Sequence, residues 1–162
     1  MKHSKIIAFD EISERAKQLH EAGKKVVATN GCFDLLHVGH VRYLQRARSL
    51  GDLLVVGLNA DTSVRALKGE GRPINREHDR AEVLAALESV DLVTIFPEPR
   101  ATRFIQAVRP DVYVKGGDYT SDSLDAEESA LLEKLGAKID IVPFEHGYST
   151  SQLLNKLRTA AE

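Results

Sequence analysis

The sequence of 162 residues contains a single cysteine, Cys32, and no long apolar run. One thiol excludes an intrachain disulfide and is typical of a protein kept in a reducing compartment. No stretch is apolar for long enough to span a membrane. The first residues, MKHSKIIAFDEISERAKQ, lack the apolar core and the small-residue cleavage site of a secretory signal. We therefore expect a cytoplasmic protein.

The chain also lacks an excess of charge, with a net charge of -2 when the histidines are neutral. This balance argues against a nucleic-acid backbone or an anionic membrane as partner, so any anionic ligand must be held by local groups. No repeat, low-complexity tract or long linker divides the sequence. The length suits one domain. We expect residues 1–162 to form a single domain.

Short apolar segments alternate with amphipathic ones along the chain. Strands are expected at 26–29, 53–58, 92–96, 111–115 and 138–144. Helices are expected at 10–23, 38–51, 76–90, 101–109, 126–136 and 150–161, with Gly51 as the left-handed residue that ends the second helix. This alternation predicts an α/β fold, a single doubly wound domain with a five-stranded parallel sheet. Ligands of such sheets bind at the carboxyl ends of the strands.

The segment NGCFDLLHVGH, residues 30–40, follows the first expected strand and is neither a G-x-G-x-x-G nor a P-loop motif. If a helix begins near His37, its first N–H groups form an anion site, and Gly39 lets a phosphate approach the backbone. His37 and His40 would share one helix face and donate to the same polyphosphate. Two alternatives remain. Cys32 and both histidines could bind a metal, although no fourth ligand stands at a recognisable spacing, or the histidines could simply pack.

The segment LKGEGRPINREHDR places four basic residues within thirteen positions, namely Lys68, Arg72, Arg76 and Arg80. Taken singly, each is typical of a solvated surface charge. As a group they predict a basic arm over a phosphate, because arginine and lysine both suit phosphate oxygens. Asn75 is the expected cap of the following helix.

Two further loops carry candidate ligand groups. Lys115, Gly116, Gly117 and Asp118 follow the fourth expected strand and form either a plain turn or a nucleotide contact. Ser149, Thr150 and Ser151 precede an apolar helical stripe. One hydroxyl there would suffice as a helix cap, and three of them also predict a second phosphate-binding helix start.

The motif GCFDLLHVGH, together with STS near the end of the chain, resembles the H-x-G-H nucleotidyltransferase superfamily. The runs TNGCFDLLHVGHVRYLQRARSLGD, LKGEGRPIN, ALESVD and PDVYVKGGDY are similar to the D-glycero-β-D-manno-heptose 1-phosphate adenylyltransferases, from about Lys24 to Leu157. The resemblance implies a Rossmann-like nucleotidyltransferase fold. It also implies transfer of AMP from ATP to the heptose 1-phosphate, giving ADP-heptose and pyrophosphate for the lipopolysaccharide inner core. Many relatives carry a fused sugar kinase, so here a separate kinase is expected upstream.

The resemblance also implies roles for individual residues. The catalytic residues would be His37, His40 and Lys68. The nucleotide would be bound by Cys32, Phe33, Gly39, Arg80, Gly116, Gly117, Asp118, Ser149, Thr150 and Ser151. The acceptor would be bound by Asp34, Arg72 and Lys115. Magnesium would enter with ATP, with no metal ligand from the protein.

Two other functions compete with this interpretation. One is a cytidylyltransferase acting on glycerol 3-phosphate or a similar alcohol phosphate. Such enzymes usually carry an arginine five residues before the first serine of the late motif, and this chain has Phe144 there, which favours adenine. The other is a non-catalytic ATP-sensing module. A homodimer is expected from the frequency of dimers among soluble enzymes.

Overall fold

The computed structural model describes residues 4–117 and 125–143, together with residues 150, 154 and 159. The described residues form helices and strands in alternation, in the order α1 (Ile12–Glu21), β1 (Val26–Gly31), α2 (Val38–Arg48), β2 (Leu53–Asn59), α3 (Asp61–Lys68), α4 (Glu77–Ala85), β3 (Leu92–Phe96), α5 (Thr102–Val108), β4 (Val112–Gly116), α6 (Ala126–Leu135) and β5 (Lys138–Val142). All five expected strands are present. In these parts of the chain, no helix is long and apolar enough to cross a membrane.

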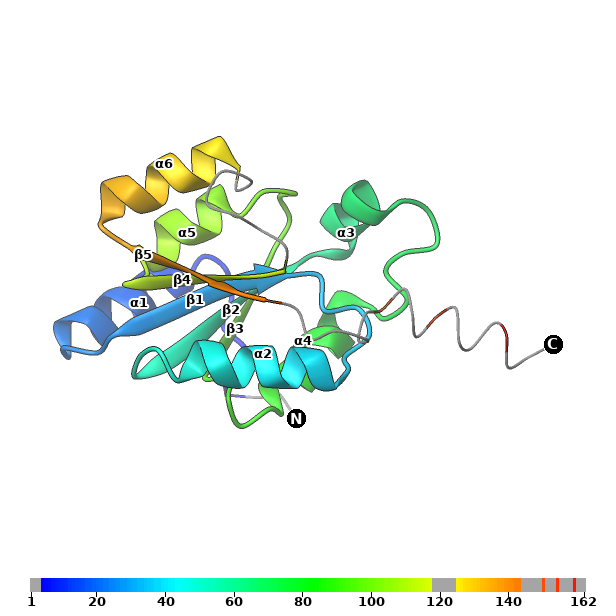
Figure 1. The fold of residues 1–162 in the computed structure, drawn as a ribbon, viewed down its shortest axis with the longest axis horizontal. Coiled ribbons are helices and arrows are strands. Elements are labelled where there is room, and N and C mark those ends of the chain that lie inside the picture. Colours follow the sequence, from blue (N-terminus) through cyan, green and yellow to red (C-terminus); the bar gives the residue numbers. More distant parts are fainter. Residues whose placement is uncertain (1–3, 118–124, 144–149, 151–153, 155–158, 160–162) are drawn as a thin grey trace.

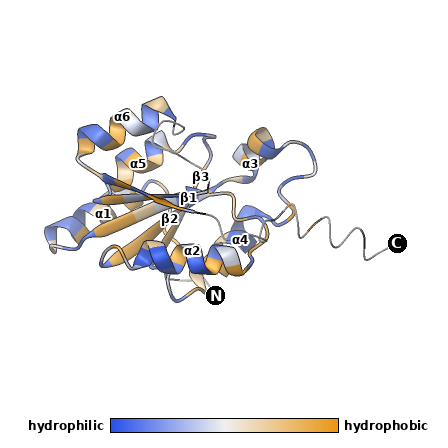
Figure 2. Ribbon diagram, viewed as in Figure 1, coloured by the Kyte–Doolittle hydropathy of each residue, from blue (hydrophilic) through white to orange (hydrophobic). Residues whose placement is uncertain are grey.

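The strands form one parallel sheet of five strands, as the sequence predicted, and their order is β3-β2-β1-β4-β5. Helices α2 and α4 cover one face, and α1, α5 and α6 cover the other (Figure 1). Figure 2 shows the apolar strands between helices whose outer sides are hydrophilic. Burial on both faces explains why the inner strands read as nearly continuous apolar runs, and every residue of β2 is buried, whereas the edge strand β5 is partly exposed.

The core consists of two layers, one on each side of the sheet. Val27 packs with Leu44 and Leu84 beneath α2 and α4, and all three side chains are fully buried. On the other face, Ile12 and Phe104 belong to the layer under α1, α5 and α6. Both layers pack against the faces of the sheet, so the loops at its carboxyl edge are attached to a packed core.

The amino edge of the sheet is closed by three aspartates that sequence reasoning missed. Asp52, Asp91 and Asp111 each precede a strand, and each carboxylate accepts a bond of 2.7 Å from a backbone N–H at the start of a neighbouring strand. These contacts satisfy donors that the parallel ladder leaves unpaired at its end. The sequence signal is an aspartate directly before an apolar run.

The expected role of Gly51 is wrong, although the glycine has a clear structural reason. Helix α2 ends at Arg48, its C-cap Ser49 is right-handed, and the backbone of Gly51 is not left-handed. A Cβ at Gly51 would lie 2.6 Å from Val27 Cγ2 and 2.7 Å from the Lys25 carbonyl oxygen. Close packing against β1, rather than backbone conformation, therefore requires glycine here.

Gly51→Ala tests this account. The added methyl group forces the start of β1 to move, so we expect the free energy of unfolding to fall by about 1–3 kcal/mol, as is usual for overpacking. Urea denaturation followed by circular dichroism measures the change. An unchanged midpoint would show that the backbone around Lys25 relaxes freely.

Helix α3 is an element that the sequence analysis did not predict, and α4 is shorter than the expected 76–90 helix. Helix α3 ends at Gly69, whose backbone has a φ of 89°. The expected final helix at 150–161 lies mostly outside the described residues. Thr150, Leu154 and Thr159, which are described, have helical backbone.

Candidate active site at the carboxyl edge of the sheet

The candidate site lies where the order of the strands reverses. Strand β1 is central, with β2 and β3 on one side and β4 and β5 on the other. The loops after β1 and β4 therefore leave the sheet toward opposite faces, and ligands of doubly wound sheets bind between two such loops. We call the region between these two loops the crevice. The carboxyl ends of the strands, α3 and the start of α2 lie together on the right of Figure 1.

Strands β1 and β4 pair only briefly before they separate. Their register covers Val27 with Val112 and Ala28 with Tyr113. Beyond this point the Tyr43 hydroxyl, from α2, lies 2.6 Å from Thr29 Oγ1 and donates to the Val114 carbonyl at 3.0 Å. A side chain thus replaces the backbone ladder at the base of the crevice.

The loop after β1 makes a tight turn at Phe33. This buried residue has a positive φ of 44°, which is uncommon without glycine. Its ring occupies the space that a Cβ at Gly31 would need, at 2.8 Å from Cε2. Glycine at position 31 and the turn at Phe33 therefore depend on each other. The backbone donors expected at Cys32 and Phe33 lie in this turn, and their binding of a nucleotide stays a prediction.

The two histidines meet at the start of α2, as their spacing predicted. His37 is the N-cap and its side chain makes no capping bond. The ring centroids of His37 and His40 are 3.9 Å apart with an interplanar angle of 34°. The Phe33 ring supports His40 from behind at 5.4 Å. Both imidazoles and the half-buried Gly39 therefore share the first turn of the helix, where N–H groups lack intrahelical partners.

Burial keeps the imidazoles neutral in the free protein. It lowers the pKa of His40 to about 4, with a smaller contribution from neighbouring His37, and it also lowers the pKa of His37. Nδ1 of His40 is buried and has no hydrogen-bond partner among the described residues. At pH 7 His40 is therefore neutral, and it can donate or accept a hydrogen bond without first losing a proton.

This pKa predicts a pH dependence of stability. Between the ordinary histidine value of 6.5 and about 4, the unfolded chain binds more protons at position 40 than the folded chain. The free energy of unfolding should therefore fall as the pH is lowered through this range. NMR titration of the His40 ring should give a midpoint of about 4 in the free protein and a higher one with ATP, because a nearby anion favours the imidazolium. A midpoint of 6.5 or above without ligand would contradict the burial argument.

Asp34 holds the following loop in place. Its carboxylate accepts from Arg72 Nε at 2.6 Å, Ile74 N at 2.8 Å and Asn75 N at 3.0 Å. Burial alone would raise the pKa of Asp34, but these hydrogen bonds outweigh it and lower the pKa. The side chain is 1% exposed. The expected contact of Asp34 with the acceptor sugar therefore has no support in this geometry.

The expected cap at Asn75 is also wrong. Helix α4 has Arg76 as its N-cap, without a side-chain bond. The Asn75 side chain instead donates through Nδ2 to the Asp34 carbonyl at 2.8 Å. Asn75 therefore fastens the 72–75 loop to the turn after β1, a long-range task that its local sequence does not reveal.

Arg80 is a buried residue whose hydrogen bonds connect several elements, rather than an exposed basic residue. Its guanidinium donates to the carbonyls of Cys32, Asn59 and Asn75 and to the Asp61 carboxylate, at 2.5, 2.9, 2.9 and 2.7 Å. Its side chain is 1% exposed. These bonds join the ends of β1 and β2, α3 and α4. Direct binding of the nucleotide by Arg80, expected from the resemblance, has no support here, because the guanidinium is already occupied.

Lys68 and Arg72 lie near the first loop, as expected for the basic arm. Lys68 is exposed at the end of α3, and its ammonium makes no hydrogen bond or ion pair with the rest of the described chain. Burial raises the pKa of the Cys32 thiol, and the charges of Lys68, Arg80 and Arg72 oppose that rise. Lys68 is therefore available to a ligand, whereas Arg72 is held by Asp34.

The loop after β4 begins with the expected glycines. A Cβ at Gly116 would lie 3.0 Å from Tyr43 Cε2, and Gly117 has a φ of 119° and donates its N–H to Val142 at 2.9 Å. Lys115 Nζ is 2.9 Å from Asn30 Oδ1 and 3.2 Å from Glu128 Oε2. Its ammonium therefore belongs to a buried network beside the crevice.

The late serine motif is described only at its middle residue. Thr150 Oγ1 donates to the Leu35 carbonyl at 3.4 Å, which brings this segment beside the turn after β1. Asp118, Ser149 and Ser151 lie outside the described residues.

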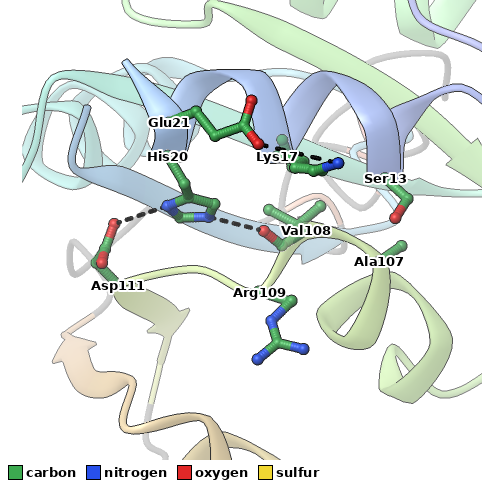
Figure 3. Close-up of a pocket in the computed structure, with 9 residues that line it drawn as sticks. Ser13, Lys17, His20, Glu21, Ala107, Val108, Arg109 and Asp111 are labelled. Carbon is green, nitrogen blue, oxygen red and sulfur yellow. Dashed lines mark hydrogen bonds and ion pairs between the residues drawn. The ribbon is translucent and has the colours of Figure 1, made fainter. Parts of the chain in front are cut away.

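A groove of about 420 Å³ lies between α1 and the segment 107–111, which leads into β4 (Figure 3). Its charged groups face one another. His20 Nε2 is 3.3 Å from the Val108 carbonyl and Nδ1 is 3.8 Å from Asp111, while Lys17 pairs with Glu21 at 3.9 Å. Asp111 also belongs to the closed amino edge, so this groove lies away from the crevice that holds the expected site residues.

A protein-bound metal ion is one of the two alternatives for the histidines, beside a pair that simply packs. Within the described ranges, no group of three or more histidine, cysteine, aspartate or glutamate side chains is placed to hold a metal ion. The His37 ring instead lies against the His40 ring, and His40 also contacts the Phe33 ring.

Comparisons with known proteins agree on one family. The cytidylyltransferase-like family model matches residues 28–156. The chain is 49% identical over 154 residues, 95% of its length, to the bifunctional protein HldE of Citrifermentans bemidjiense, and 52% identical over 138 residues, 85% of its length, to that of Geobacter sulfurreducens. It spans only about a third of these relatives, 31% and 28%.

Two solved structures share the fold. The lipopolysaccharide core biosynthesis protein of Thermoplasma volcanium matches with a TM-score of 0.61 and 32% identity, over 76% of this chain and 98% of that one. Pantoate-beta-alanine ligase of Francisella tularensis matches with a TM-score of 0.60 and 16% identity, over 90% of this chain and 68% of that one, and so supports the fold alone. The expected Rossmann-like nucleotidyltransferase fold is confirmed.

Proposed function

Since the chain belongs to the cytidylyltransferase-like family, we propose that it transfers AMP from ATP to D-glycero-β-D-manno-heptose 1-phosphate, giving ADP-heptose and pyrophosphate. The observation that carries the proposal is the pair of imidazoles 3.9 Å apart at the start of α2, at the point where the strand order reverses. The similarity to HldE over 95% of the chain and to a lipopolysaccharide core biosynthesis protein supports the choice of substrates.

The chemistry suits a site without a general base. An oxygen of the sugar phosphate attacks the α-phosphorus of ATP, the bond to the β-phosphate breaks, and pyrophosphate leaves. The phosphate oxygen is already a competent nucleophile at neutral pH. The main barrier is the approach of one anion to another, and fixed donors lower it by stabilising the charge on the transferring phosphoryl group.

Each part of the crevice has a task in this reaction. His37 and His40 donate to the transferring phosphoryl group, and the N–H groups of Cys32, Phe33 and Gly39 hold the triphosphate. Thr150, beside Leu35, and its neighbours Ser149 and Ser151 hold the β- and γ-phosphates. Gly116, Gly117 and Asp118 lie along the nucleoside. Lys68, exposed near Cys32, receives the acceptor phosphate, while Lys115 stays paired with Asn30 and Glu128 beside the crevice.

In this proposal magnesium would enter together with ATP. It would supply charge neutralisation to the polyphosphate when bound. A kinase activity supplies the sugar 1-phosphate, and the protein acts as a homodimer. "Bifunctional" in the names of the HldE relatives, together with the fraction of each that this chain covers, accords with a second activity carried elsewhere in those proteins.

The second candidate is a cytidylyltransferase acting on glycerol 3-phosphate or a similar alcohol phosphate, and the family description, cytidylyltransferase-like, favours its nucleotide but names no acceptor. Pyrophosphate release by the purified protein with magnesium separates the two. ATP and CTP are each paired with the β and α anomers of the heptose 1-phosphate and with glycerol 3-phosphate. Turnover with ATP and the β anomer alone supports the proposal. Turnover with CTP overturns it, and ATP binding without turnover favours a sensor.

A further inference from the structure

The side chain of Asn30 bridges the gap where β1 and β4 separate. The strands pair as far as Ala28 and Tyr113, and two residues later Asn30 would face Lys115. In place of backbone bonds, Asn30 Oδ1 accepts from the Tyr113 hydroxyl at 2.5 Å and from Lys115 Nζ at 2.9 Å. A single side-chain oxygen of β1 therefore connects β1 to β4 beyond the last backbone pair.

These contacts fix the orientation of the Asn30 amide. An ammonium can only donate, so the amide atom that faces Lys115 must be oxygen and the NH₂ group must point away from β4. Lys115 is held in turn by Glu128, which is 5% exposed and accepts the Ala101 N–H at 2.8 Å. The network extends from the crevice to α5 and α6 and leaves the amide little freedom to turn.

The NH₂ group has no hydrogen-bond partner among the described residues. Asn30 is half-buried near the end of the central strand β1, shortly before the loop that leads to His37. Its Nδ2 makes no hydrogen bond to any described residue. Nδ2 is not among the fully buried side-chain atoms that lack a partner, so solvent reaches it, and a ligand oxygen that takes the place of this solvent can accept its hydrogen bond. Because Tyr113 and Lys115 both bind the amide oxygen and fix the amide, its NH₂ group is a fixed donor that can bind an oxygen atom of a ligand.

We infer that Asn30 Nδ2 donates a hydrogen bond to an oxygen of a bound substrate and so helps to determine specificity. This inference rests on the proposed function, because it places a substrate in the crevice. The acceptor is a hydroxyl or phosphate oxygen. Both the nucleotide and the sugar phosphate offer such atoms, and separate binding measurements distinguish them.

The test compares two variants by calorimetric titration with ATP and, separately, with the heptose 1-phosphate. Asn30→Asp keeps an oxygen for Tyr113 and Lys115 but removes the donor, and Asn30→Ala removes the donor without adding charge. We expect both variants to raise Kd for the same substrate by roughly 3- to 10-fold, the usual effect of one hydrogen bond, and to leave Kd for the other within about twofold. The matched control, Tyr113→Phe, retains the Lys115 anchor and should leave both Kd values within about twofold.

An unchanged Kd for both substrates in Asn30→Ala would overturn the inference, since the donor would then touch neither. An effect confined to Asn30→Asp would also overturn it, because charge repulsion alone would explain the loss. Failure of the proposed function gives a different result. Wild-type protein would then bind ATP without turnover, or turn over with CTP, while the comparison of the variants is made on whichever nucleotide binds.

Discussion

His40→Ala should lower kcat by roughly 100- to 1,000-fold, the usual loss for one transition-state donor. The imidazole lies at the first turn of α2 beside His37, and its low pKa keeps it neutral at pH 7. The variant loses a positioned hydrogen bond to the charge that builds on the phosphoryl group. Its melting temperature should change by only a few degrees, because the ring lies at the rim of the core and its Nδ1 is unpaired among the described residues. Steady-state pyrophosphate release and thermal unfolding provide the two readouts.

His78→Ala is the matched control, because His78 is exposed on α4 and lies outside the candidate site. It should retain wild-type kcat. His40→Gln keeps one N–H donor and should recover part of the lost rate. Full activity in His40→Ala would remove this residue from the mechanism.

Arg80→Met should reduce the free energy of unfolding by about 3–5 kcal/mol, as expected when one partner of a buried ion pair is removed. The guanidinium has four oxygen partners, and its side chain is 1% exposed. Methionine fills much of the volume but leaves three carbonyls and the Asp61 carboxylate without their donor. Chemical denaturation monitored by circular dichroism measures the loss.

Arg65→Met provides the control, because Arg65 is exposed on α3 close to the same network. It should change stability by less than about 0.5 kcal/mol. Equal stability of Arg80→Met and the wild type would show that the hydrogen bonds of Arg80 do not stabilise the fold. Arg80 would then again be a candidate for direct nucleotide binding.

The fold could be predicted because its central strands are buried on both faces and read as short apolar runs, although the edge strand β5 is partly exposed and carries Lys138 and Asp140. The alternation with helices then leaves few topologies for a parallel sheet. Helix α3 could not be found in the same way, since its eight residues are mostly exposed and bury only Ser63 and Val64. Gly51 looked like a helix terminator, but its packing partner is Val27, 24 positions away in the sequence.

The site was predictable where function follows from local spacing. His37 and His40 meet because a helix starts between them, which the glycine and the apolar stripe indicated. Charged residues were harder to place. Asp34 and Arg80 carry the residue types of a substrate site, yet their partners come from other elements and bury them. Asn30 was missed because Tyr113 and Lys115, its partners, lie more than 80 residues away.

The most direct test of adenylyl transfer follows the label from ATP. The protein is incubated with magnesium, the β anomer of the heptose 1-phosphate, and ATP labelled at either the α- or the γ-phosphate. We predict that the α-label appears in the sugar nucleotide and the γ-label in pyrophosphate, with His40→Ala slowing both. Transfer of the γ-label to the sugar, or recovery of all the label in ATP, would contradict the account.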